Sequence, residues 1–172
     1  MPIRSTWVVA APRAALIVGV ADMIASNAAN AELVTHSLGS CLGVMIYDPV
    51  VKAGGLLHAM LPSSKIDPPK GVESPFMFLD TGLPRLFHAV FGLGAQKPRL
   101  LVKVAGGSQF LEEKCIFNIG QRNIAALNEI LSRNGITPLA MDVGGNHCRT
   151  VRMELAEGTI TVHSPGREAY AL

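Results

Sequence analysis

Cysteine is scarce in this chain, and its arrangement excludes a disulfide framework. The 172 residues include three cysteines, Cys41, Cys115 and Cys148, and no Cys-x-x-Cys pair. An odd and sparse set is atypical of small secreted folds and suits a reducing, cytoplasmic environment. His147 adjoins Cys148, but neighbouring residues of a strand point to opposite faces. The sequence therefore predicts no structural metal site.

Charge and long apolar runs are also scarce. Charged residues make up 16% of the chain, the net charge is +2, and lysine and arginine form no cluster. This balance predicts no nucleic-acid partner. Pro12, Arg13 and Asp22 interrupt the apolar stretches near the N-terminus. No stretch reaches the ~20 residues of a membrane-spanning helix, so we expect no membrane insertion.

The remaining composition is that of a globular domain. Hydrophobic residues make up 49% of the chain, and a chain of this length fits one domain with its own core. We interpret residues 1–15 as an N-terminal extension and residues 16–172 as a single domain.

Hydrophobic periodicity predicts strands mixed with two helices. Apolar residues at helical spacing predict helices over Leu79–Leu93 and Gln121–Asn134. Residues 62–75, which contain four prolines, are expected to form a loop. Strands are expected over Leu16–Met23, Leu33–Thr35, Cys41–Tyr47, Gly54–Leu61, Arg99–Val104 and Leu139–Val143, with a C-terminal hairpin that turns near Glu157 and Gly158. This order predicts an α+β fold of mixed layers, with a mixed sheet flanked by helices.

Cys41 and His58 occur in two neighbouring predicted strands. The stretches are VTHSLGSCLGVMIYDP, from residue 34, and GGLLHAMLP, from residue 54. An antiparallel hairpin centred between Pro49 and Val50 pairs Cys41 with His58. Directly opposed residues have Cβ atoms about 4.5–5.5 Å apart on one face, so the thiol and the imidazole would meet.

A paired thiol and imidazole are typical of nucleophilic acyl transfer. The imidazole takes the thiol proton, and main-chain N–H groups near Gly39 and Ser40 can bind the developing oxyanion. A third group must orient the imidazole, and Thr35, His36 and Ser37 are the polar candidates nearby. The alternative is that Cys41 is a small buried hydrophobe and His58 an ordinary hydrogen-bonded core residue. Residue types alone leave both interpretations open.

Six stretches, in order over about residues 16–163, carry a further signal: ELVTHSLGSCLGVMIYDP, GGLLHAMLP, DTGLPRLFHAVFGLGA, RLLVKVAGG, FNIGQRNIAALNEILSRNGI and DVGGNHCRTVRMELAEGTITV. Together they resemble the CheD family of chemoreceptor glutamine deamidases. The resemblance implies that Cys41 is the nucleophile, His58 the general base and Thr35 the third member. It also implies a layered fold related to cysteine-dependent toxin deamidases, with no metal or cofactor.

The same resemblance implies a substrate and a partner. The substrates are specific glutamines on the helical cytoplasmic domain of chemoreceptors, so we expect a cytoplasmic protein. An alternative is a binding module, catalytic or not, that stimulates a CheC-type phosphatase of phosphorylated CheY. The chain departs from the family pattern at Ser108, Gln109 and Phe110 and at His36. We expect these departures to affect substrate or partner preference rather than the chemistry.

Overall fold

The structure is a computed structural model that describes residues 14–109 and 118–172. Cys115 and Phe110 lie outside the described residues, as does the expected N-terminal extension apart from Ala14 and Ala15, which begin the first strand. The extension therefore stays a prediction.

The described residues form strands, helices and short 3-10 turns. The strands are β1 (Ala14–Ile17), β2 (Asp22–Ser26), β3 (Ala31–Leu38), β4 (Leu42–Asp48), β5 (Ala53–Ala59), β6 (Leu101–Gly106), β7 (Ala140–Val143), β8 (Arg149–Glu154), β9 (Ile160–His163) and β10 (Tyr170–Ala171). The helices are α1 (Pro68–Glu73), α2 (Leu79–Gly92) and α3 (Ile119–Arg133), and the 3-10 turns are η1 (Ser64–Ile66), η2 (Pro75–Met77) and η3 (Lys97–Arg99). The predicted α2 and α3, and the C-terminal hairpin of β8 and β9, are confirmed.

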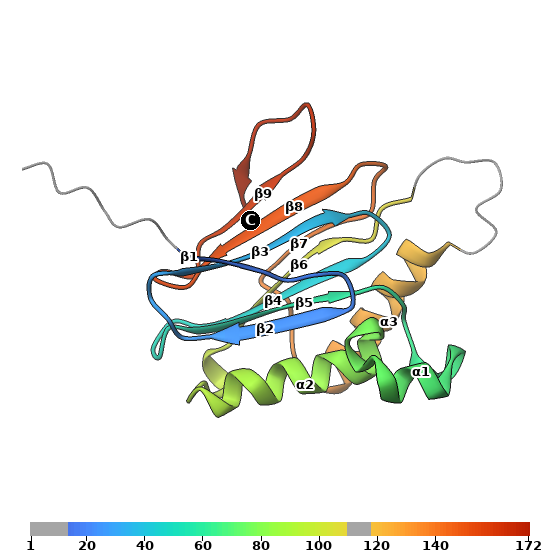
Figure 1. Cartoon of the computed structure of the whole chain (residues 1–172), viewed down its shortest axis with the longest axis horizontal. Coiled ribbons are helices and arrows are strands. Elements are labelled where there is room, and N and C mark those ends of the chain that lie inside the picture. The colour runs from blue at the N-terminus through green and yellow to red at the C-terminus, as the bar shows by residue number, and fades with distance from the viewer. Residues whose placement is uncertain (1–13, 110–117) are drawn as a thin grey trace, which may run out of the picture.

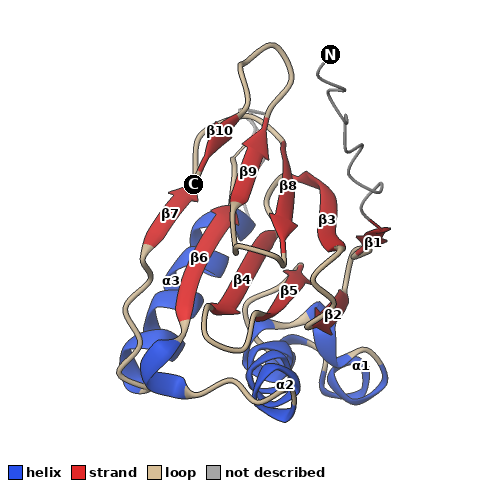
Figure 2. Cartoon of the chain, turned by 90° about the vertical axis from the view of Figure 1, so that its left-hand side faces the viewer, coloured by secondary structure: helices blue, strands red, loops and turns tan. Residues whose placement is uncertain are grey.

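Two five-stranded sheets stack on one another, and the helices cover one of them. The outer sheet has the order β1-β3-β8-β9-β10 and the central sheet the order β2-β5-β4-β6-β7. Each sheet contains one parallel pair, β1–β3 and β6–β7, and is otherwise antiparallel. Figure 1 shows the helices together below β2, β4 and β5, and Figure 2 shows the same arrangement from the side. The α+β class with mixed sheets and flanking helices is confirmed.

The expected single sheet is instead two sheets. The chain leaves the outer sheet after β3 and enters the central sheet at β4, within residues 39–41. Alternation of apolar residues shows that a strand has a buried face, but it does not show which sheet the strand joins. The sequence pattern therefore could not separate the layers.

The central sheet is buried on both faces. On β4, Leu42, Val44 and Ile46 pack against the helices, whereas Met45 and Tyr47 pack against the outer sheet. Alternate side chains of a strand point to opposite faces, so β4 serves two cores. This double burial explains why every residue of β4 is buried.

Two segments differ from the predicted elements. Leu16–Met23 is not one strand but the end of β1, a turn and the start of β2. Ala21 in this turn has φ +55°, and the Asp22 carboxylate accepts the N–H groups of Gly19 and Met23. The expected loop over 62–75 contains η1, α1 and the start of η2, because the Asp67 side chain caps α1. In both segments an aspartate side chain accepts hydrogen bonds from nearby main-chain N–H groups and stabilises a local turn, which hydropathy alone does not predict.

Candidate active site

Thr35 and His58 meet in the buried layer between the two sheets. Thr35 lies on β3 and His58 on β5, and they are 0% and 1% exposed. The Thr35 Oγ1 atom is 2.8 Å from His58 Nδ1. Leu33 and Leu56, two positions earlier on the same strands, also belong to the core between the sheets. Strand alternation therefore brings two of the predicted site residues into direct contact.

The hydrogen bonds of Thr35 determine which nitrogen of His58 carries the proton. The Thr35 hydroxyl donates to the carbonyl oxygen of Val18 at 2.8 Å. A hydroxyl has one hydrogen, so Oγ1 accepts the bond from His58, and Nδ1 is the protonated nitrogen. His58 Nε2 then carries the lone pair. Nε2 is buried without a hydrogen-bond partner in the described part of the chain. The neutral ring therefore has a free basic nitrogen.

The turn between β1 and β2 supports this pair from the side. The Val18 carbonyl accepts the Thr35 hydroxyl, and the Ala21 N–H donates to the main-chain oxygen of His58 at 3.0 Å. Because β1 belongs to the outer sheet and β2 to the central sheet, this turn joins the two sheets beside the pair. The sequence predicts one continuous strand over Leu16–Met23, so it did not predict this turn or its contacts.

Cys41 does not lie directly opposite His58, so the predicted hairpin register is wrong. His58 pairs with Gly43, two residues beyond Cys41. A shift of two residues preserves the face of the sheet, whereas a shift of one would reverse it. Cys41 precedes β4 and packs against the core between the sheets, as the face predicts. In a regular sheet, diagonal neighbours of this kind lie about 7–8 Å apart. Cys41 forms no hydrogen bond with His58 Nε2, so the structure does not bring these two side chains into direct contact.

Asp48 explains the observed register of the β4–β5 hairpin. Its buried carboxylate accepts the Val50 N–H at 2.9 Å, the Gln96 N–H at 2.9 Å and the Arg99 guanidinium at 2.7 Å. The hydrogen bond from Arg99 lowers the pKa of Asp48 to about 2. The resulting connection spans residues 49–52, with Lys52 at φ +52°, in place of a tight turn. Contacts from a distant segment thus set the register.

Inward hydrogen bonds hold the main chain around Cys41. The Gly39 carbonyl accepts the Ser108 N–H, and the Cys41 carbonyl accepts the Gly107 N–H, both at 2.8 Å. Gly106 has φ +112°, and a Cβ there would lie 2.2 Å from the Cys41 oxygen. Only glycine permits this close approach of the segment after β6.

Burial shifts the pKa values of both Cys41 and His58. Desolvation raises the pKa of the Cys41 thiol, an effect that the Cys41 main-chain N–H opposes. Desolvation lowers the pKa of the His58 imidazole. Each shift favours the uncharged form, so the resting pair at neutral pH is a thiol and a neutral imidazole.

Ser108, a departure from the family pattern, has an internal role. It is 1% exposed, and its hydroxyl donates to the His147 carbonyl at 2.6 Å and accepts from Arg149 at 2.7 Å. Arg149 also pairs with Asp142 through two hydrogen bonds. Ser108 therefore anchors the segment beside Cys41 and presents no side chain to a partner. His36 is exposed on β3, so its effect on partner preference stays a prediction.

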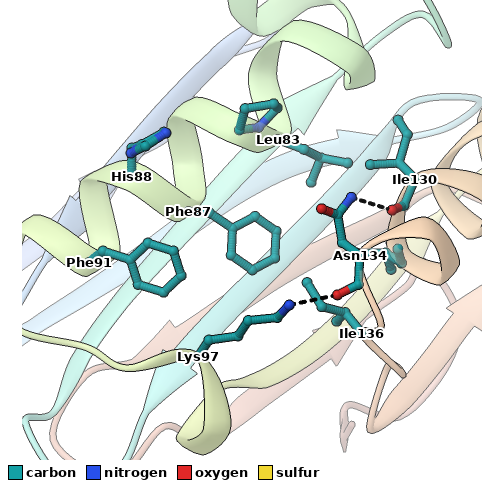
Figure 3. A pocket seen from close by; sticks show the side chains of 10 residues that line it. Leu83, Phe87, His88, Phe91, Lys97, Ile130, Asn134 and Ile136 are labelled. Carbon is teal, nitrogen blue, oxygen red and sulfur yellow. Dashed lines mark hydrogen bonds between the residues drawn. The ribbon is translucent and has the colours of Figure 1, made fainter.

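A groove lies elsewhere, on the helical side of the central sheet. It has a volume of about 230 Å³ and runs between α2 and α3. Phe87 and Phe91 line one wall, Ile130 and Ile136 the other, and Lys97 donates to the Asn134 carbonyl at its edge (Figure 3). Thr35, Cys41 and His58 are not among the lining residues. The groove is therefore separate from the candidate site.

Sequence reasoning missed two residues that contact the site. Val18 looks like an ordinary strand residue, and only its carbonyl is used. Asn123 lies in α3, where it is 0% exposed and donates to the carbonyl of Ser40. A signal for Asn123 was present, because it precedes Leu127 and Leu131 on the buried stripe of the helix. A polar residue on an apolar stripe indicates a specific hydrogen bond.

The described residues define an α+β protein with a buried threonine–histidine pair between two sheets. Residues 39–41, here called the Cys41 loop, lead into β4, which pairs with the strand of His58. Residues 60–164, more than half of the chain, match the family model described as CheD chemotactic sensory transduction. The chain belongs to the CheD family, which confirms the resemblance. The family-model match begins after His58, so by itself it assigns no role to Thr35, Cys41 or His58.

Curated relatives cover nearly the whole chain. The chain is 45% identical over 153 residues to a protein of Solibacter usitatus named probable chemoreceptor glutamine deamidase CheD, covering 89% of this chain and 90% of the relative. It is 47% identical over 151 residues to probable chemoreceptor glutamine deamidase CheD 1 of Syntrophus aciditrophicus, covering 88% and 94%. Within residues 14–109 and 118–172, no helix is long and apolar enough to cross a bilayer.

Proposed function

We propose that this chain hydrolyses the side-chain amides of specific glutamines on chemoreceptors, giving glutamate and ammonia in the cytoplasm. The names of relatives that are 45% and 47% identical support this activity and this substrate. The observation that carries the proposal is the Thr35–His58 hydrogen bond, because it leaves His58 Nε2 as a free base on the strand whose His58 pairs with Gly43, two residues after Cys41.

Cys41 acts as the nucleophile in the first half of the reaction. His58 Nε2 takes the thiol proton as the sulfur attacks the carbon of the glutamine carboxamide. The N–H groups of Ser40 and Cys41 bind the oxyanion of the tetrahedral intermediate, with Gly39 shaping the loop. The C–N bond breaks, and the nitrogen leaves as ammonia with the proton from His58. The product is a thioester between Cys41 and the glutamate side chain.

Water completes the reaction. His58 Nε2 removes a proton from water as its oxygen attacks the thioester carbon. The second tetrahedral intermediate collapses, the C–S bond breaks, and the sulfur regains the proton from His58. Thr35 orients the imidazole throughout, since its acceptor role keeps the proton on Nδ1. Every step uses side chains, main-chain N–H groups and water, so the mechanism calls for no metal or cofactor.

Mass spectrometry of a receptor fragment tests this proposal. A cognate receptor cytoplasmic fragment is incubated with the wild-type chain or with the Cys41→Ala variant. We expect glutamine-to-glutamate conversion at discrete positions with the wild-type chain alone. Equal conversion by both proteins would contradict the role of Cys41. No conversion by a folded wild-type chain would favour the binding-module alternative, which stimulation of CheY-phosphate hydrolysis by a CheC-type phosphatase would then test.

A further inference from the structure

One buried amide contacts both the Cys41 loop and the end of the His58 strand. Asn123 Nδ2 donates to the Ser40 carbonyl at 2.9 Å and to the Met60 carbonyl at 2.8 Å. Ser40 directly precedes Cys41, and Met60 follows His58 by two residues. Asn123 is 0% exposed, and its Oδ1 atom has no partner within the described residues. The side chain is therefore held only through its donor end.

The packing of α3 fixes where this amide lies. Gly120, one turn before Asn123, has no side chain, and a Cβ there would lie 2.4 Å from the Gly107 carbonyl oxygen. Gly107 in turn donates its N–H to the Cys41 carbonyl. Leu127 anchors the next turn of the helix in the core below the central sheet. The close packing of α3 therefore holds the Asn123 side chain in contact with the Cys41 loop.

Peptide geometry turns these contacts into an orientation of the loop. In a planar trans peptide, the C=O of one residue and the N–H of the next point in opposite directions. The Ser108 N–H holds the Gly39 carbonyl inward, so the Ser40 N–H points outward. Asn123 holds the Ser40 carbonyl inward, so the Cys41 N–H points away from α3. Neither N–H group donates to a main-chain carbonyl within residues 14–109 and 118–172.

We propose that Asn123 is a positioning residue that orients the Cys41 N–H toward the oxyanion and links the Cys41 loop to the strand of His58. This inference rests on the proposed function. Asn123 does not touch the substrate. It acts through the Ser40–Cys41 peptide, whose N–H group stabilises negative charge that exists only in the tetrahedral intermediate. Its loss therefore slows the chemical step more than substrate binding.

Kinetics of the Asn123→Leu variant test the inference, since leucine has a similar size and no donor. With a receptor fragment as substrate, we expect kcat to fall by about tenfold to a hundredfold, approaching the loss of an oxyanion donor. We expect KM to stay within about twofold, because no substrate contact is removed. The rate at which iodoacetamide alkylates Cys41 should change much less than kcat, since alkylation forms no oxyanion.

The Leu131→Ala variant is the matched control, because it weakens the packing of the same helix two turns away from Asn123. It should lower the melting temperature and leave kcat unchanged. An unchanged kcat in Asn123→Leu would overturn the inference. So would a loss of kcat that parallels a loss of alkylation and of stability, because Asn123 would then be merely structural.

A second variant keeps the test decisive if Asn123→Leu does not fold. In Asn123→Asp, a protonated carboxyl can donate one hydrogen bond, whereas an ionised carboxylate donates none and repels the Ser40 carbonyl. We expect its kcat, relative to the wild type, to fall as pH rises. A constant ratio across pH would contradict the inference. Failure of the proposed function is distinguishable, because wild type and Cys41→Ala would then be equally inactive.

Discussion

The two faces of the central sheet differ in what they bury, although the same strands build both. On the helical face, β4 and β5 contribute Leu42, Val44 and Leu57 to an apolar core with α2 and α3. On the other face, β5 contributes His58, and Thr35 of the outer sheet meets it. Along β4 and β5 both faces are buried, and only the face toward the outer sheet carries a histidine.

The difference shows how a polar site is accommodated in a core. Burying a polar group without a hydrogen bond destabilises a fold. Thr35 Oγ1 and His58 Nδ1 satisfy each other, and Val18 accepts the remaining hydroxyl hydrogen. Of the polar side-chain atoms of this pair, only His58 Nε2 stays without a hydrogen-bond partner in the described part of the chain. The unsatisfied atom therefore indicates function on one face, while the apolar face supplies stability.

Removing the nucleophile should have the largest effect. The Cys41→Ala variant loses the sulfur that forms the thioester, so we expect deamidation to fall by about 10⁴-fold or more. The His58→Ala variant should lose activity to a similar extent, because residues that act as a unit are not additive. Ammonia release from a receptor fragment measures both. Circular dichroism that matches the wild type shows that the folds are intact, and retained activity in either folded variant would contradict the mechanism.

Changing Thr35 should have a smaller effect. The Thr35→Val variant keeps the shape but removes the acceptor for His58 Nδ1–H, so the ring loses its fixed tautomer. We expect kcat to fall by about tenfold to a hundredfold, less than the loss of the general base itself.

The Thr35→Ser variant is the matched control, because it keeps the hydroxyl. It should retain most of the activity. Equal losses in the valine and serine variants would show that packing of the Thr35 methyl group matters, rather than its hydrogen bond.

The shared face of Cys41 and His58 could be predicted from the sequence, but the register of their two strands could not. The alternation in β4 and β5 puts Cys41 and His58 on one face, and the two-residue error in register preserved that result. The register itself depends on Asp48, which binds Gln96 and Arg99 from a distant segment. Local turn chemistry does not contain this information.

Supporting contacts through the main chain were also beyond prediction. The Val18 carbonyl and the Ala21 N–H exist in any sequence, and only the turn between the sheets aims them at Thr35 and His58. The resemblance to a family identified the three candidate side chains. The resemblance did not reveal the turn at residues 18–21, and hydropathy predicts one continuous strand there.

The pH dependence of Cys41 alkylation should reveal the uncharged resting pair. Burial raises the pKa of Cys41 and lowers the pKa of His58. The thiolate should therefore form only above the ordinary thiol pKa of about 8.5, and alkylation should accelerate in that range. Deamidation should persist below about pH 6.5, because His58 stays neutral to lower pH than an ordinary histidine.

Iodoacetamide labelling in a Cys115→Ser, Cys148→Ser background measures the alkylation profile. Full reactivity already at pH 6 would indicate a stable thiolate–imidazolium pair instead. That result would contradict the uncharged resting pair, while it would leave the role of Cys41 as nucleophile intact.

The smallest effect on catalysis should come from the apolar face. Leu86 of α2 is 0% exposed and belongs to the core below the central sheet. The Leu86→Ala variant leaves a cavity there, so we expect it to destabilise the fold by about 2–5 kcal/mol. Because His58 and the Leu86 side chain lie on opposite faces of β5, kcat of the folded fraction should stay within about twofold of the wild type, as for a mutation that removes no transition-state contact. Urea denaturation and deamidation kinetics on one preparation measure both quantities. A large loss of kcat without unfolding would show that the two faces are coupled through the strands, and the division between stability and chemistry would then fail.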